Sequence, residues 1–193
     1  MTSYKVTTPA TTDPVTLPEI KAHCRVTWDN EDAYLASGVK AATDFYQQQT
    51  NRQLVNATYL LTLREWGEND HVVLPVAPLS SLASVQYYDG NGTNQTWASS
   101  NYYVDTAEEP GRIYLATGAT FPGVADRRDA IRISYVAGYG TPANVPALDK
   151  AAVKLMAANW FENREPNVIG TIVTELPLAV RSIIQSRRVV TLY

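Results

Sequence analysis

The sequence predicts an α+β protein, in which a helical bundle carries an inserted antiparallel β region at about residues 54–136. Apolar residues recur at helical steps of three and four near both ends of the chain. Between those ends the chain changes to short alternating stretches that are separated by Gly, Pro, Asn and Asp. Because the helical and strand-like segments are grouped rather than interleaved, the pattern favours α+β over a parallel α/β sheet.

The first residues differ in texture from the rest of the chain. Residues 1–14 are rich in Thr and Pro and show no periodicity, so we expect a flexible N-terminal tail. Residues 15–188 are long enough for one domain, and residues 189–193 are expected to form a C-terminal arm. The predicted organisation is therefore a tail, a single domain and an arm.

Two helices are predicted at the N-terminal end of the bundle. Thr16 and Glu19 have the spacing of a capping box, and a short helix should follow to about Val26. An acidic start at residues 29–32 predicts a second helix that ends near Asn51, since Asn tolerates the left-handed conformation that closes helices. The apolar face of this second helix comprises Leu35, Val39, Ala42, Phe45 and Tyr46.

The β region is predicted from short strands and their turns. Asp-Gly and Asn-Gly at residues 89–92 are strong signals for a hairpin, because both supply positive φ angles. Residues 131–135 alternate cleanly between apolar and polar positions, as a half-buried strand does. The other strands are expected at residues 59–63, 71–74, 84–88, 102–105 and 112–115.

A long helix and a short last helix are predicted after the β region, at about residues 145–164 and 176–188. The long helix is so apolar that it should be well buried. Gly138, Gly140 and Pro142 precede it and lack the Gly-Lys-Ser/Thr of a phosphate-binding loop. We interpret these three residues as a structural corner between the last strand and the long helix.

Composition argues against catalysis and against a metal or cofactor site. The chain has two histidines and one cysteine, and His23 and Cys24 are neighbours on a helix, so their side chains point about 100° apart. His71 has no acidic or thiol neighbour at ligand spacing. A net charge of −3 does not suit a protein that grips DNA by counterion release, and no apolar run is long enough to span a membrane. We therefore predict a non-enzymatic protein without cofactors that works by contact.

An ordered set of segments resembles the head-tail connector (adaptor) proteins of tailed bacteriophages and gene transfer particles. The segments span about residues 14–188, and none of them is diagnostic alone. Asn51 stands where the family often has glycine, and Phe121 stands where it often has tryptophan. The segments are LPEIKAHCRVTWDNEDAYL, TNRQLVNATYLLTL, VVLPVAPLSSLASVQYYDGNG, YYVDTAEEPGRIYL, YVAGYG, VPALDKAAVKLMAANWFENRE and ELPLAVRSIIQSRR.

This resemblance implies a structural component of the virion at the head-tail interface, made in the cytoplasm of the bacterial host. Such proteins form a ring, typically of twelve subunits, beneath the portal protein. The ring joins the portal to stopper or tail-completion proteins. Double-stranded DNA passes through it without sequence-specific binding.

The C-terminus is the predicted docking segment. Its end is apolar and β-prone, follows two arginines, and suits strand addition or insertion into a groove of a partner. The resemblance favours the portal as that partner. Removal of residues 187–193 is expected to leave a folded protein that no longer binds portal, unless these residues form a strand of the protein's own sheet. The docking residues are Arg187, Arg188, Val189, Val190, Leu192 and Tyr193.

An alternative function remains open at this point. The chain has twelve tyrosines, and tyrosine suits surfaces that combine an apolar ring with a polar tip. The β region could therefore be a non-enzymatic ligand-binding module that uses exposed tyrosines and Trp97.

Overall fold

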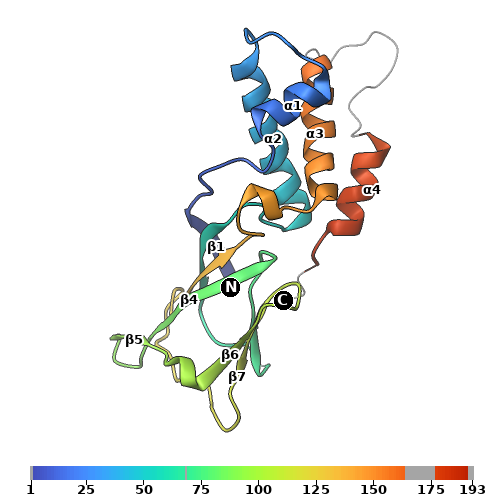
Figure 1. Ribbon diagram of the computed structural model, residues 1–193. Helices are drawn as coiled ribbons and strands as arrows, with labels where there is room; N and C mark the ends of the chain where they lie inside the picture. The colour runs from blue at the N-terminus through green and yellow to red at the C-terminus, as the bar shows by residue number, and fades with distance from the viewer. Residues whose placement is uncertain (1, 68, 164–176, 191–193) are drawn as a thin grey trace, which may run out of the picture. The chain divides into compact units, whose positions relative to one another are not determined.

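The computed structural model describes residues 2–67, 69–163 and 177–190 (Figure 1). The chain divides into two compact units. The β unit comprises Met1–Ala10, Asn56–Tyr139 and Val189–Tyr193, and the helical unit comprises Thr11–Val55 and Gly140–Arg188. The β region has an apolar core of its own.

The helical unit contains the helices that the sequence predicted, including both local signals at their ends. Thr16 and Glu19 form the reciprocal capping box, with the Thr16 backbone N–H 2.7 Å from Glu19 Oε2. Asn51 closes the second helix in the left-handed conformation, at φ 54°. The elements are α1 (Leu17–Cys24), α2 (Asp32–Thr50), the 3-10 turn η2 (Pro142–Asn144), α3 (Ala147–Glu162) and α4 (Leu178–Arg187).

The core of the helical unit is built from one face of each α-helix. Leu35, Val39 and Tyr46 of α2 are almost fully buried, as the helical steps predicted. Leu148, near the start of α3, is 47% exposed, so the apolar residues of α3 are not buried along its whole length. The other buried residues of these helices are Ile20, Ala42, Ala152, Val153, Met156, Ala157, Val180 and Ile184.

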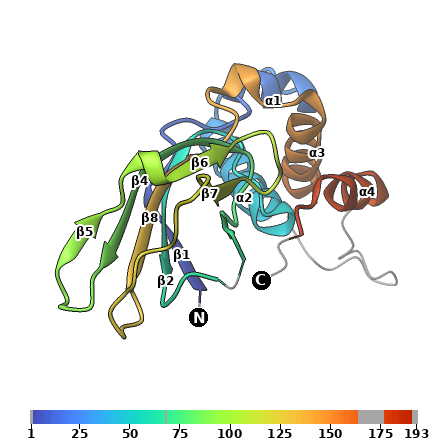
Figure 2. The same ribbon diagram turned by 90° about the horizontal axis from the view of Figure 1, so that it is seen from below.

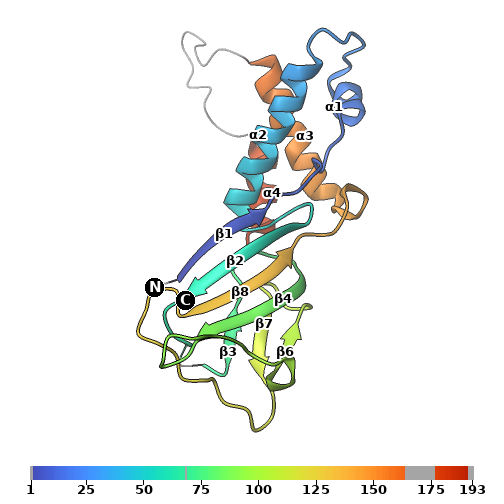
Figure 3. The ribbon, with the colours of Figure 1, turned by 90° about the vertical axis from the view of Figure 1, so that its left-hand side faces the viewer.

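The β unit contains two antiparallel sheets among the described residues. The larger sheet has the strand order β1-β2-β8-β4-β5, and the smaller has the order β3-β7-β6 (Figures 2 and 3). The predicted hairpin at residues 89–92 connects β4 to β5, which the sequence analysis did not identify as a strand. The strands are β1 (Thr2–Thr8), β2 (Ala57–Leu63), β3 (His71–Val73), β4 (Leu79–Tyr88), β5 (Asn94–Thr96), β6 (Tyr102–Asp105), β7 (Arg112–Leu115) and β8 (Ile131–Ala137).

One apolar core joins residues from both sheets of the β unit. Leu61, Ile131 and Ile133 of the larger sheet are fully buried and belong to the same core as Ile113 of the smaller sheet. The alternation that identified β8 is exact, since its buried and half-buried residues alternate along its whole length.

The first residues are not the flexible tail that we expected. Thr2–Thr8 form β1, which pairs antiparallel with β2. The sequence did not reveal this because the partner strand lies more than fifty positions along the chain, and because backbone hydrogen bonds need no particular side chains. Residues 11–14, the last part of the predicted tail, belong to the helical unit.

Gly138, at the end of β8, occupies a conformation that other residues rarely adopt. Its φ is 131°, and a Cβ atom placed on it would lie 2.7 Å from the backbone nitrogen of Asn56. Its own N–H donates to the carbonyl of Pro78 at 2.9 Å. The nearest atoms to such a Cβ belong to the backbone of Asn56, so no movement of a flexible side chain would make room for it.

Gly138→Ala should lower the free energy of unfolding by about 1–3 kcal/mol, because it combines an unfavourable φ with a backbone clash. Gly90→Ala is the matched control, since a Cβ at Gly90 would meet no atom within 4 Å. Urea titration of both variants measures the difference. Equal stability of the two variants would show that residue 138 is not held in this conformation.

Candidate docking site at the C-terminal segment

The six predicted docking residues fall into three groups. Arg187 is the last residue of α4, and Arg188, Val189 and Val190 follow it in extended or irregular backbone. Leu192 and Tyr193 lie outside the described residues. The structure therefore gives the geometry of the first four.

Arg187 forms an ion pair inside the helical unit. Its Nε and Nη2 atoms lie 2.8 and 3.0 Å from the two carboxylate oxygens of Asp149, on α3. Asp149 is fully buried, and its Oδ1 also accepts a hydrogen bond of 2.8 Å from the hydroxyl of Tyr46, on α2. Burial, together with the bond to Asp149, raises the pKa of Tyr46 far above its ordinary value. One buried carboxylate thus links α2, α3 and α4.

A second contact fixes the backbone at the end of α4. Arg52 is 6% exposed, and its Nε donates to the carbonyl of Arg187 at 2.6 Å. The last carbonyls of a helix lack partners within the helix, so a cation at this end satisfies one of them and also interacts favourably with the helix dipole. Arg187 was predicted as a docking residue, but its guanidinium is already bound to Asp149 within the helical unit.

Two residues of the segment that follow Arg187 are exposed. Arg188 is exposed, and Val190 is 67% exposed, whereas Val189 is only 5% exposed. At the other end of α4, Leu178 is 78% exposed. Arg188 and Val190 are therefore the exposed residues that follow α4, and we call these two residues the exposed pair.

The three corner residues contain no docking feature. Gly138 and Gly140 have positive φ angles of 131° and 97°, and Pro142 begins the 3-10 turn η2. A Cβ at Gly140 would lie 3.1 Å from the side-chain nitrogen of Asn144, which leaves little space beside it.

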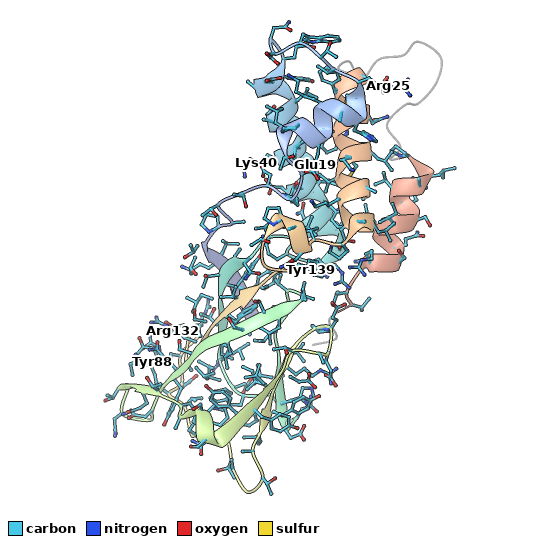
Figure 4. All side chains as sticks on the ribbon, viewed as in Figure 1. Glu19, Arg25, Lys40, Tyr88, Arg132 and Tyr139 are labelled. Carbon is cyan, nitrogen blue, oxygen red and sulfur yellow. The ribbon has the colours of Figure 1, made fainter. Side chains whose placement is uncertain are left out.

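Three half-buried charged residues of the β unit, Arg127, Asp129 and Arg132, pair with one another. The guanidinium carbon of Arg127 lies 3.7 Å from the centre of the Tyr88 ring, and that of Arg132 lies at 5.1 Å (Figure 4). Hydrogen bonds from Arg127 and then Arg132 lower the pKa of Asp129 to about 2. Asp129 therefore pairs with Arg127 and also with Arg132, which lies three positions further along the chain.

Trp97 does not lie on an exposed ligand face. It is 6% exposed and packs against Trp66, Tyr102 and Phe121, with ring centres 5.0–5.6 Å apart. The Phe121 ring in turn stacks on the Trp66 ring, with their centres 4.8 Å apart, so an aromatic side chain packs here in place of the tryptophan common in the family. The alternative of a binding module that uses Trp97 is therefore wrong for this residue, because its ring is part of the core.

Neither a metal site nor a membrane-spanning helix is seen within the part of the chain that the structure describes. No three His, Cys, Asp or Glu side chains there are grouped as metal ligands. No helix among those residues is long and apolar enough to cross a membrane.

A family comparison confirms the resemblance seen in the sequence. Residues 14–109 match the family model described as Phage gp6-like head-tail connector protein. The matched segment contains α1, α2 and the strands from β2 to β6. No curated protein sequence matches the chain.

Solved structures show that the whole chain has the fold of proteins found in gene transfer agent (GTA) particles. A chain from the neck of an empty GTA particle, computed with C6 symmetry, aligns with a TM-score of 0.79 and 24% identity, covering 100% of this chain and 97% of that one. A chain from the virion of a native particle gives 0.81 and 23%, covering 98% and 97%. A chain from the neck of the native particle, computed with C12 symmetry, gives 0.76 and 24%, covering 99% and 97%.

Proposed function

We propose that this chain, a relative of the Phage gp6-like head-tail connector proteins, is a structural subunit of the neck of a phage or phage-like particle. The observation that carries the proposal is the agreement of two independent comparisons. The family model matches the first half of the chain, and the fold of GTA neck and virion proteins extends over nearly all of it. The proposed role needs no catalytic group.

The subunits assemble into a ring, of twelve copies in our proposal. One of the similar chains comes from a neck computed with C12 symmetry, and another from a neck computed with C6 symmetry, which is compatible with a twelve-fold arrangement. Closed cyclic symmetry needs a head-to-tail interface, in which two different surfaces of the same subunit meet. The ring lies between the portal and the stopper or tail-completion proteins, and double-stranded DNA passes through it.

The portal is the proposed partner of the C-terminal segment. The exposed pair presents one cation and one apolar side chain next to a rigidly anchored helix end. Because the end of α4 is already held in place, the residues that follow it lose less conformational freedom when they bind, and this favours affinity. A net charge of −3 is compatible with a ring that DNA slides through, because a strongly basic lining would retain the DNA.

Deletion of the gene from the genome that encodes the particle tests this role. We expect the mutant to produce heads and tails that are not joined, with joining restored when the protein is supplied from a plasmid. Negative-stain electron microscopy of the lysate counts joined particles. Normal numbers of joined particles in the mutant would contradict the proposed function.

A further inference from the structure

The N-terminal strand β1 is attached to the rest of its sheet by one neighbour. It lies at the edge of the larger sheet and, among the described residues, pairs with β2 (Figure 3). Residues 3–9 are exposed throughout, which is unusual for a strand within a folded sheet. β1 is therefore held mainly by backbone hydrogen bonds to β2.

The side chains of β1 nevertheless fit β2 specifically. Tyr4 is the cross-strand partner of Leu61, and Val6 is the partner of Tyr59, so both lie on the core face of the sheet. The Tyr4 and Tyr59 rings are 6.4 Å apart. Tyr4 and Val6 nevertheless remain 45% and 46% exposed.

The edge of β2 must be paired with a strand, either from the same chain or from another copy. Leu61 and Tyr59 are 0% and 7% exposed with β1 in place. Burial raises the pKa of Tyr59 to about 12, and the nearby Tyr4 contributes to this rise. Without β1, β2 would present an apolar, unpaired edge, which promotes aggregation in soluble proteins.

We infer that β1 is exchanged in the assembled ring, so that the β1 strand of each copy pairs with β2 of the next copy in the register seen here. The inference rests on the proposed ring. A head-to-tail ring requires two different, complementary surfaces on one chain, and β1 and the β2 edge are such surfaces. Each copy would give one strand and receive one.

The connection after β1 suits such an exchange. Pro9–Asp13 are exposed apart from Ala10, which is half-buried, and Pro14 and Val15 then anchor the chain in the helical unit. Five extended residues reach up to roughly 17 Å, which allows β1 to leave its own sheet without moving α1. The boundary between the two compact units also lies here, between Ala10 and Thr11.

The free-energy cost of the exchange is small because the same bonds form in both states. The hydrogen bond of 3.1 Å from the Thr62 hydroxyl to the carbonyl of Ser3 is retained, as is the pairing of the two strands. In a dilute monomer the intramolecular pairing is favoured by its high effective concentration. In a ring, the neighbouring β2 is held at a comparable effective concentration.

Disulfide trapping tests the exchange. The variant Ser3→Cys/Thr62→Cys places two thiols at paired positions, and Cys24→Ser removes the native thiol. We expect mild oxidation of the free monomer to give a disulfide within one chain. Oxidation of rings assembled on the portal should instead give a ladder of covalent multimers on a non-reducing gel.

A mixed-ring experiment and an out-of-register control separate exchange between copies from pairing within one chain. Rings that mix a Ser3→Cys chain with a Thr62→Cys chain can link only between copies, and we expect covalent dimers there but not in the unassembled mixture. Lys5→Cys/Thr62→Cys is the control, because Lys5 pairs with Leu60 and the two thiols are out of register. Intact rings that contain only intrachain disulfides would overturn the exchange and leave the proposed function standing. Failure to form any ring with the unmodified chain would overturn both.

Discussion

Arg187→Met should lower the free energy of unfolding by about 3–5 kcal/mol, the cost of leaving a buried charge without its partner. Asp149 is 0% exposed and loses both hydrogen bonds from the guanidinium, so among the described residues it retains the bond from Tyr46. Urea titration followed by far-UV circular dichroism measures the loss.

Matched variants separate this effect from a general effect of charge. Arg188→Met removes the neighbouring, exposed cation and should change the stability by less than about 0.5 kcal/mol. The triple variant Tyr46→Phe/Asp149→Leu/Arg187→Met should recover most of the loss, because it replaces the buried ion pair with apolar side chains and leaves no tyrosine hydroxyl without its acceptor. A loss below about 1 kcal/mol for Arg187→Met alone would show that the ion pair is not formed in solution.

The double variant Arg188→Glu/Val190→Asp should weaken binding to portal rings at least about tenfold, which corresponds to roughly 1.4 kcal/mol. It reverses one charge and places another on the exposed pair, while the anchor formed by Arg187 and Asp149 stays intact. Co-sedimentation of the variant with portal rings measures the change in binding.

Lys40→Glu provides the control for this second variant, since Lys40 is an exposed cation on α2, away from the C-terminal segment in sequence (Figure 4). Its binding to portal should be unchanged, and both variants should melt at the temperature of the unmodified chain. Full binding by Arg188→Glu/Val190→Asp would exclude the exposed pair as a docking surface.

The deletion of residues 187–193 is no longer a clean test of docking. It removes Arg187, and a loss of binding would then be mixed with the instability of an unpaired Asp149. It also removes the buried Val189. Point variants that keep both residues avoid this difficulty.

Local signals predicted most of the secondary structure because their causes lie within a few residues. The capping box at Thr16 and Glu19 and the left-handed Asn51 both formed as expected. The Asp-Gly and Asn-Gly turns formed the hairpin between β4 and β5. The alternation of β8 gave its buried face directly.

Contacts between distant residues could not be predicted in the same way. Asp149 was visible as a charged residue on a helix expected to be buried, and such a residue needs a partner. No local pattern singled out Arg187, thirty-eight positions away, as that partner. The pairing of β1 and the contacts of Trp97 with Trp66 and Phe121 escaped prediction for the same reason, since these partners are remote in the chain.

Electron microscopy of the purified protein mixed with its cognate portal tests the central claim most directly. The proposal predicts that copies of this chain form a closed ring on one face of the portal, with twelve-fold symmetry in class averages and an open central channel. Portal particles without added density, or with isolated copies bound outside a ring, would contradict the assignment of this chain as a head-tail connector.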